Sequence, residues 1–128
     1  MMKLDLFSEI YKGKKVLVTG DTGFKGSWMC IWLKELGADV YGYALPALTS
    51  KDNYVTTKLS DKIKHIDGDV RNLEQLQNYF SQVKPDIAFH LAAQPLVIES
   101  YNNPHYNFET NLMGTVNFFE AVRNCPSV

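Results

Sequence analysis

The chain has 128 residues, of which 45% are hydrophobic and 12% aromatic, and its formal net charge is −1 at pH 7. This length and apolar content are typical of one folded domain and exclude a disordered chain. Without an excess of basic residues, the chain has no field that attracts nucleic acid or an acidic membrane surface. The apolar runs are too short to span a bilayer, and the first residues lack the apolar core of a signal peptide. We therefore expect a cytoplasmic protein.

Strand and helix patterns alternate along the chain. Apolar residues at helical spacing predict a first helix, which Gly37 ends, and Asn72 or Asp69 can cap a later one. The segment 45–60 is irregular and has room for one helical turn. The apolar positions of the first helix are Phe24, Trp28, Ile31, Trp32 and Leu36. The expected strands are 14–19, 39–43, 62–67 and 86–91, and the expected helices are 24–36, 72–83 and 105–124.

This alternation predicts an α/β fold, a Rossmann-type doubly wound parallel sheet with helices on both faces. Right-handed crossovers give the strand order 3-2-1-4 for the strands present. Ligands of such sheets bind outside the carboxyl ends of the strands, at the switch point that here lies between strands 1 and 4.

A glycine-rich turn follows the first strand, because residues 19–26 read Thr-Gly-Asp-Thr-Gly-Phe-Lys-Gly. Gly20 allows the turn, Gly23 allows close approach of phosphates, and Gly26 allows the helix to pack against the strand. The spacing is G-x-x-G-x-x-G instead of the common G-x-G-x-x-G, and ordinary turns also use glycine. The strand, turn and helix together favour a pyrophosphate site at the helix N-terminus. Ala92-Ala93-Gln94 follows the fourth strand, so two segments point to one crevice.

The cysteines and histidines give no metal-ligand spacing. Cys30 and Cys125 are far apart, and Cys30 lies among apolar helix residues, where it is most simply a small core residue. His90 ends a buried strand and is interpreted as a packed histidine with satisfied hydrogen bonds. We expect no metal.

Four segments, in this order, resemble the extended short-chain dehydrogenase/reductase superfamily of NAD-dependent epimerases and dehydratases. They are 19–26, Gly-Asp-Val-Arg at 68–71, His-Leu-Ala-Ala-Gln at 90–94 and Thr-Asn-Leu-Met-Gly-Thr at 110–115. Finer details resemble the nucleotide-sugar 4,6-dehydratases of that superfamily, with CDP-glucose as the implied substrate. These details are the segments 23–28, 40–45 and 92–97, with Ser100-Tyr101 after them. The resemblance covers the chain from Gly13 onward.

The resemblance implies NAD as the cofactor and a nucleotide sugar as the substrate. The pyrophosphate would be wrapped by Gly20, Thr22, Gly23, Phe24, Lys25 and Gly26. The adenine would lie beside Asp69 and Val70, and the nicotinamide half beside Leu91, Ala92, Ala93 and Gln94, with Thr110 also touching the cofactor. The sugar would meet Gln94, Ser100 and Tyr101.

Simpler interpretations remain open for several of these residues. Asp69 could cap the helix that follows it, and Lys25 could be a solvated surface lysine. Gln94 and the Ser100-Tyr101 pair could be ordinary loop residues. Asn111 is more simply structural than a cofactor ligand.

One feature departs from the family pattern. A ribose-binding Asp or Glu is expected about 20 residues after the glycines, but the sequence has Ala44-Leu45-Pro46 there. Asp52 or Asn53 could substitute. No arginine lies nearby for a 2′-phosphate, so NAD is still favoured over NADP.

The superfamily's chemistry uses a Tyr-x-x-x-Lys helix after the fifth strand, in which the lysine lowers the pKa of the tyrosine. Two pairs match this spacing, Tyr11 with Lys15 and Tyr54 with Lys58, but both lie in the wrong part of the sheet and are rejected. We therefore expect residues 1–128 to be the N-terminal part of an NAD-binding domain that ends before strand 5. The catalytic helix and the substrate domain would be absent, and this chain alone would be inactive.

The resemblance implies a lyase in the parent protein, a homodimer or larger homo-oligomer. It would oxidise C4 of CDP-glucose, eliminate water across C5 and C6, and return hydride to C6, in the synthesis of lipopolysaccharide O-antigen sugars. Two alternatives remain: another nucleotide-sugar epimerase or reductase, and a non-catalytic dinucleotide-binding module.

Overall fold

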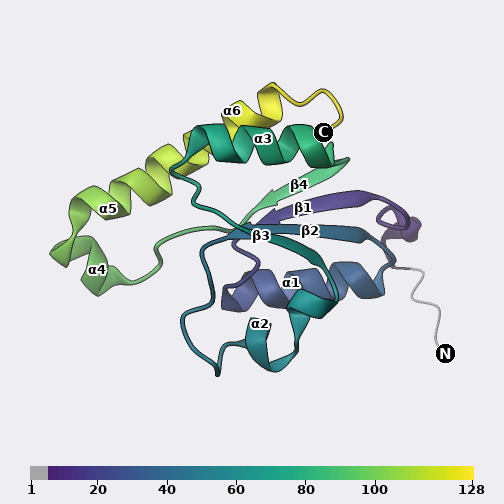
Figure 1. Cartoon of the computed structure of the whole chain (residues 1–128), viewed down its shortest axis with the longest axis horizontal. Coiled ribbons are helices and arrows are strands. Elements are labelled where there is room, and N and C mark those ends of the chain that lie inside the picture. The colour runs from purple at the N-terminus through teal and green to yellow at the C-terminus, as the bar shows by residue number, and fades with distance from the viewer. Residues whose placement is uncertain (1–5) are drawn as a thin grey trace.

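Four parallel strands form the centre of the structure, a computed structural model that describes residues 6–128. The strands are β1 (Lys15–Thr19), β2 (Asp39–Ala44), β3 (Lys64–Asp67) and β4 (Ile87–His90). They lie in the order β3-β2-β1-β4, which confirms the predicted sheet. Figure 1 shows helices on both faces of it.

The carboxyl ends of the strands lie together at one edge of the sheet. Thr19 at the end of β1 pairs with Tyr43 on one side and with His90 on the other, and Ala44 pairs with Asp67. The turns that follow β1 and β4 therefore start side by side. The predicted segments 19–26, 68–71 and 90–94 begin at or directly after these strand ends.

Helices cover the two faces of the sheet separately (Figure 1). One face carries α1 (Phe24–Glu35), α2 (Asn53–Thr56) and the 3-10 turn η2 (Leu59–Asp61), and the other carries α3 (Leu73–Val83) and α6 (Gly114–Arg123). Strand β1 is buried from Val16 onward because it lies between two strands and two helical layers. A short 3-10 turn, η1 (Leu6–Glu9), precedes it.

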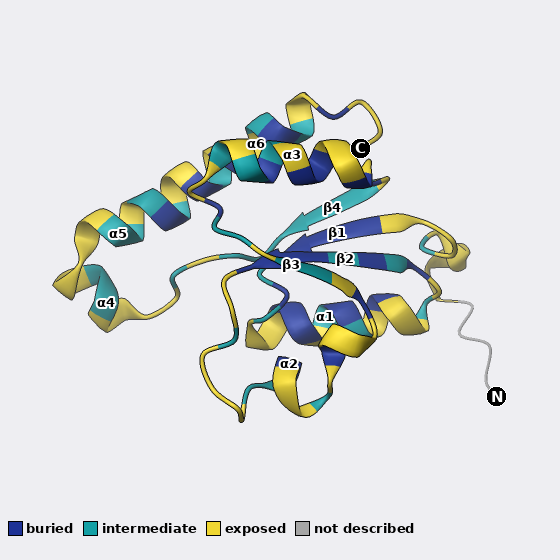
Figure 2. Cartoon of the chain, in the orientation of Figure 1, coloured by how far each residue is buried: buried dark blue, intermediate teal, exposed yellow. Residues whose placement is uncertain are grey.

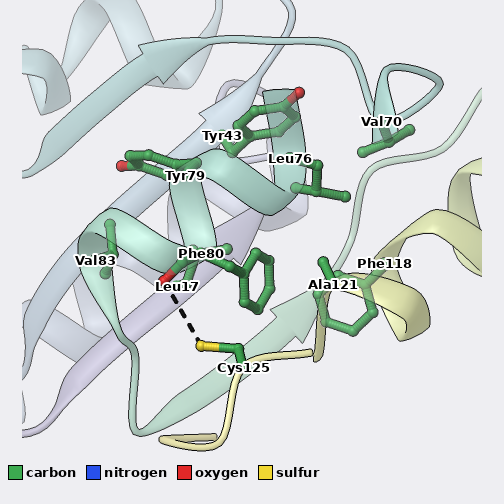
Figure 3. Close-up of a cluster of buried hydrophobic side chains, with 10 residues drawn as sticks. All are labelled: Leu17, Tyr43, Val70, Leu76, Tyr79, Phe80, Val83, Phe118, Ala121 and Cys125. Carbon is green, nitrogen blue, oxygen red and sulfur yellow. Dashed lines mark hydrogen bonds between the residues drawn. The ribbon is translucent and has the colours of Figure 1, made fainter. Parts of the chain in front are cut away.

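Each face has its own apolar core. The core under α3 and α6, drawn in Figure 3, is built from Leu17, Tyr43, Val70, Leu76, Tyr79, Phe80, Val83, Phe118, Ala121 and Cys125. The core under α1 and α2 is built from Val16, Val18, Cys30, Leu33, Ala38, Val40, Tyr54, Leu59 and Ile63. Cys30 is fully buried there, as the sequence predicted.

Helix α3 follows its predicted pattern closely. The side chain of Asn72 accepts a hydrogen bond from the backbone N–H of Gln75 at 3.0 Å, so Asn72 and not Asp69 caps the helix. Leu76 and Phe80 face the core. The helix ends where Lys84 adopts a left-handed conformation, with φ of 51°, before Pro85.

Helix α1 buries a face that its apolar spacing did not specify. Its apolar spacing predicted the helix correctly, but three aromatic positions are not buried: Phe24, Trp28 and Trp32 are 74%, 52% and 49% exposed. The buried positions are instead small or short side chains, namely Gly26, Ser27, Cys30 and Leu33. At the start of the helix this face has no room for a side chain, because a Cβ on Gly26 would overlap the carbonyl oxygen of Gly20.

The single long helix expected over 105–124 needs a correction. It begins as α5 (Pro104–Phe108), continues through a π-helical turn η3 (Glu109–Met113) and ends as α6. A further helix, α4 (Val97–Asn102), precedes it and was not predicted. The π turn carries Thr110 and Asn111, so the irregularity lies at the predicted site, where such turns are common.

The segment made of α5, η3 and α6, called the helical arm below, carries an apolar stripe that is exposed to solvent. Figure 2 shows exposed residues along this arm. The stripe consists of Phe108, Leu112, Met113, Val116 and Phe119, each of them between 47% and 64% exposed. Strand β4 is an edge of the described sheet, and all four of its residues are only half-buried. Contiguous exposed apolar side chains of this kind are typical of surfaces that associate.

Candidate functional site

The glycine turn after β1 leaves the N-terminus of α1 open. Gly20 has a φ of 80°, and its carbonyl oxygen accepts a hydrogen bond from the N–H of Gly23 at 3.0 Å. A Cβ on Gly26 would overlap that same carbonyl oxygen, so only glycine fits there. The N-cap is Gly23, and no side chain caps α1. The first N–H groups of the helix therefore face outward at the positive end of its dipole, which suits a phosphate.

The segment after β4 lies directly against this turn. A Cβ on Gly20 would lie 2.7 Å from the backbone N of Ala92, so a side chain there would force the two segments apart. The backbone N–H groups of Leu91 and Ala92 donate to the hydroxyl oxygen of Thr19 at 3.2 and 3.3 Å. The two segments thus lie side by side at the ends of β1 and β4, as the sequence predicted.

His90 connects this junction to the π turn. Its Nδ1 lies 2.7 Å from the hydroxyl of Thr19, and its Nε2 lies 3.2 Å from the hydroxyl of Thr115. Because the Thr115 hydroxyl donates to the carbonyl oxygen of Asn111, it accepts from Nε2–H, and Nδ1 accepts from Thr19. Burial lowers the pKa of His90, and its ring stacks on Phe118 at 4.7 Å. It is a neutral, packed histidine, as the sequence analysis proposed.

Asn111 holds the loop that follows β4. Its side-chain oxygen accepts from the N–H of Gln94 at 2.7 Å, and its amide nitrogen donates to the carbonyl oxygen of Gln94 at 3.0 Å. The Gln94 side chain bonds to the backbone of Leu96 and to the side chain of Asn107. Gln94, predicted to meet the cofactor and the sugar, therefore uses its side chain to shape its own loop.

The carboxylate of Asp69 is hydrogen-bonded to Arg71, a residue that was not predicted to belong to the site. The guanidinium of Arg71 donates to both carboxylate oxygens of Asp69, at 2.8 to 3.1 Å. Burial acts to raise the pKa of Asp69, and the hydrogen bonds from Arg71 outweigh it, so the pKa is lowered. Arg71 also bonds to Glu109 at 3.1 Å and lies over the ring of Tyr106. It thus links the segment after β3 to the start of the long helical arm.

The remaining predicted residues differ in whether their side chains are buried, bonded or exposed. The side chain of Val70 is in the core against Gly114, and the hydroxyl of Thr22 donates to the carbonyl oxygen of Leu45 at 2.7 Å. The other residues face solvent or lie away from the turn: Lys25 and Ala93 are exposed, Tyr101 is 80% exposed, and Ser100 bonds to Val97 within α4. Thr110 is buried, and its hydroxyl has no hydrogen-bond partner within residues 6–128.

A buried ionic group lies under the glycine turn and was not predicted. The Asp21 side chain is fully buried, and its Oδ2 lies 2.6 Å from Nδ1 of His65 on β3. Nε2 of His65 lies 2.9 Å from Oδ1 of Asp67. Gly42 on β2 makes this contact possible, because a Cβ there would overlap the Asp21 carboxylate. The contact crosses a strand, so it follows from the register of β2 and β3 and has no signature in the local sequence.

Of the two rejected Tyr-x-x-x-Lys pairs, the one that ends at Lys15 lies away from this edge, whereas the ring of Tyr54 lies 5.4 Å from that of His65, which contacts Asp21 of the glycine turn. Lys15 begins β1, at the end of the sheet opposite the glycine turn. Tyr54 is buried in the core under α1, and burial raises its pKa to about 12. A shallow hollow lined by Asn72, Gln75, Asn78 and Gln82 lies along α3 and contains none of the predicted site residues.

Residues 6–128 contain no group of three His, Cys, Asp or Glu side chains arranged to hold a metal ion. None of the helices described within that range has the length and apolar character needed to cross a bilayer.

The parallel sheet, the open glycine turn and the loop after β4 together define a member of the extended short-chain dehydrogenase/reductase superfamily. The pattern of the family described as GDP-mannose 4,6 dehydratase matches residues 17–128. The chain therefore belongs to this family.

Individual relatives agree with this assignment. The chain is 47% identical over 118 residues to CDP-glucose 4,6-dehydratase of Salmonella typhimurium, which covers 92% of this chain and 33% of the relative. An epimerase structure from Methanothermobacter thermautotrophicus matches with a TM-score of 0.79 and 31% identity, over 91% of this chain and 34% of that one. UDP-glucose 4-epimerase of Thermus thermophilus in complex with NAD matches with a TM-score of 0.77 and 30% identity, over 88% and 35%. The chain thus spans about a third of the length of these relatives.

The Asp21–His65 pair predicts a stability that falls as pH rises. Burial raises the pKa of Asp21 above 3.8. Desolvation lowers the pKa of His65, but its hydrogen bonds to Asp21 and Asp67 raise it above 6.5 overall. Both groups bind protons more tightly in the folded chain than in the unfolded chain. Their contribution to the free energy of unfolding is therefore complete below the unfolded pKa values and is lost as pH rises through the folded pKa values. Each unit of difference for His65 corresponds to about 1.4 kcal/mol.

Urea unfolding measured between pH 6 and pH 8.5 checks this expectation. Relative to the double variant Asp21→Asn/His65→Gln, the unmodified chain should lose free energy of unfolding across this range. The lowered pKa of His90 adds the same rise at the low end of the range to both chains, so the difference between them is the quantity to compare. His105→Gln is the matched control because its ring is exposed, and it should keep the slope of the unmodified chain. An equally steep fall in the double variant would contradict the assignment.

Proposed function

We propose that this chain is the NAD-binding part of a nucleotide-sugar 4,6-dehydratase that converts CDP-glucose to CDP-4-keto-6-deoxyglucose. The observation that carries the proposal is the glycine turn: Gly20 and Gly26 have no room for a Cβ, and no side chain caps the helix that follows. The membership of the family and the similarity to the Salmonella enzyme support the reaction and the substrate. NAD is supported by the Thermus epimerase structure that contains it.

The residues present fit a dinucleotide. The open N–H groups at the start of α1 would bind the pyrophosphate, and the orphan hydroxyl of buried Thr110 would gain a partner from the cofactor. Asp69, oriented by Arg71, would accept from the exocyclic amine of adenine. The small side chains of Ala92 and Ala93 would let the nicotinamide half lie against the backbone.

Bound NAD would supply a hydride acceptor and donor for the sugar, and this chain would contribute binding and orientation. Its own residues would fix the position of the cofactor, because Thr19 and Asn111 hold the loop after β4 through hydrogen bonds. The tyrosine and lysine that act on the sugar hydroxyl in the superfamily are proposed to lie outside residues 1–128. A cytoplasmic location and a role in making O-antigen sugars belong to the same proposal.

A second candidate is C4 epimerisation of a nucleotide sugar, which the two epimerase structures favour. The protein that contains this chain separates the two candidates. Formation of a 4-keto-6-deoxy product from CDP-glucose supports the dehydratase, and interconversion of UDP-glucose and UDP-galactose without a keto product supports the epimerase.

Replacing Gly23 tests the cofactor site. The backbone of Gly23 is extended, with φ of −73° and ψ of 169°, so any residue can adopt it. A Cβ on Gly23 would lie 3.3 Å from the carbonyl oxygen of Gly20, so Gly23→Val needs a small local shift there but no change in backbone conformation. Its branched side chain would stand in front of the helix N-terminus. We expect NAD affinity, measured by calorimetric titration, to fall more than about tenfold, which is about 1.4 kcal/mol. Equal affinity in a folded Gly23→Val variant would exclude the turn as the phosphate site.

A homo-oligomer of the parent protein is proposed on the exposed apolar stripe of α5, η3 and α6, since such patches drive association. Sedimentation velocity across a dilution series should show that the chain self-associates. Val116→Glu/Phe119→Glu should shift it toward monomer. Leu48→Glu, at a 93% exposed position in a loop, should leave association unchanged. A monomer at high concentration, or equal effects of both changes, would refute the assignment.

A further inference from the structure

The end of β2 has no carboxylate for the ribose of a dinucleotide. Such folds usually place an Asp or Glu there, about 20 residues after the glycines, and this chain has Ala44 and Leu45. Both substitutes considered from the sequence already bond within their own segment or to α1. The carboxylate of Asp52 accepts from the N–H and the hydroxyl of Thr49, and the amide of Asn53 donates to Ser27 at 2.8 Å.

The neighbouring strand supplies a carboxylate at the same level. Asp67 ends β3 and is the register partner of Ala44, and the N–H of Gly68 donates to the carbonyl oxygen of Ala44 at 2.8 Å. Paired residues of parallel strands place their side chains on the same face of the sheet. His65, two residues earlier, has its ring against Asp21 of the glycine turn. Asp67 therefore faces the side of the sheet on which the glycine turn and α1 lie.

The Asp67 carboxylate is oriented and partly open. Its Oδ1 lies 2.9 Å from Nε2 of His65, whose other ring nitrogen is fixed by buried Asp21. Its Oδ2 accepts no hydrogen bond from any side chain or backbone group of residues 6–128, and the side chain is 67% exposed. One oxygen is thus held by the protein while the other is available at the ligand-binding edge. A surface aspartate without such a brace would lose rotamer freedom on binding a ligand.

We propose that Asp67 accepts hydrogen bonds from the adenosine ribose hydroxyls and so replaces the missing carboxylate of β2. It would select NAD over NADP, because a 2′-phosphate would bring its negative charge against the carboxylate. His65 is then a positioning residue, which holds Asp67 at this edge. The inference rests on the proposed NAD binding and adds the residue that selects between the two cofactors.

Calorimetric titrations of NAD and of NADP test the inference on the unmodified chain and on Asp67→Asn. Asp61→Asn is the matched control, an exposed aspartate in η2. We expect Asp67→Asn to bind NAD about tenfold more weakly and NADP no more weakly than before, so the ratio of the two affinities falls. Asp61→Asn should keep both affinities. Thermal unfolding of each variant confirms that it is folded.

Two failures are distinguishable. If the unmodified chain binds NAD and the folded Asp67→Asn variant keeps the same ratio of NAD to NADP affinity, this inference is overturned and the cofactor proposal stands. If the unmodified chain binds neither nucleotide, the cofactor proposal fails and this inference fails with it.

Discussion

The close approach of Gly20 to the backbone of Leu91 and Ala92 is the constraint on which the rest of the site depends. No side chain fits between the end of β1 and the segment that leaves β4. The hydroxyl of Thr19 accepts a hydrogen bond from the backbone of that segment and also bonds to His90. The other ring nitrogen of His90 bonds to Thr115, next to the π turn. Two loops from distant parts of the sequence therefore share one edge, with the open start of α1 between them.

Polar contacts keep the loops at this edge in place. Backbone groups beyond the strand ends have no ladder partners, so they need other hydrogen bonds. Asn111 satisfies both backbone groups of Gln94, and the amide of Asn117 donates to the carbonyl oxygens of Val70 and Arg71. The loops after β3 and β4 are both anchored to the same helical arm. Order at the cofactor edge consequently depends on how that arm packs.

The sequence predicted the architecture well because short strands alternate with helices and clear turn signals separate them. Strand order and the burial of Cys30 followed from local pattern and crossover handedness, and the cap of α3 was narrowed to Asn72 or Asp69, of which the structure uses Asn72. The exposed aromatic face of α1 did not follow, because helical spacing shows that residues share a face and does not show which face meets the sheet. At Gly26, where the helix begins beside the glycine turn, a Cβ would overlap the carbonyl oxygen of Gly20.

The site was predictable only in part. The glycine turn and the segment 91–94 carry local signals, and the structure brings them together. Arg71, His65 and Asp67 act across strands or between a strand and a helix, so their partners depend on register and packing. The π turn at Thr110 and Asn111 likewise has no local signature, since its reason is contact with the loop after β4.

Backbone amide resonances of the isotope-labelled chain, followed by NMR as NAD is added, test the central claim most directly. The account predicts shifts at 22–27, 69–70 and 91–94, three segments that the fold places at one edge. Amides of the hollow along α3, around Asn78 and Gln82, should stay unchanged. Shifts confined to that hollow, or no shifts at a concentration of NAD that saturates its relatives, would contradict the assignment of this edge as the dinucleotide site.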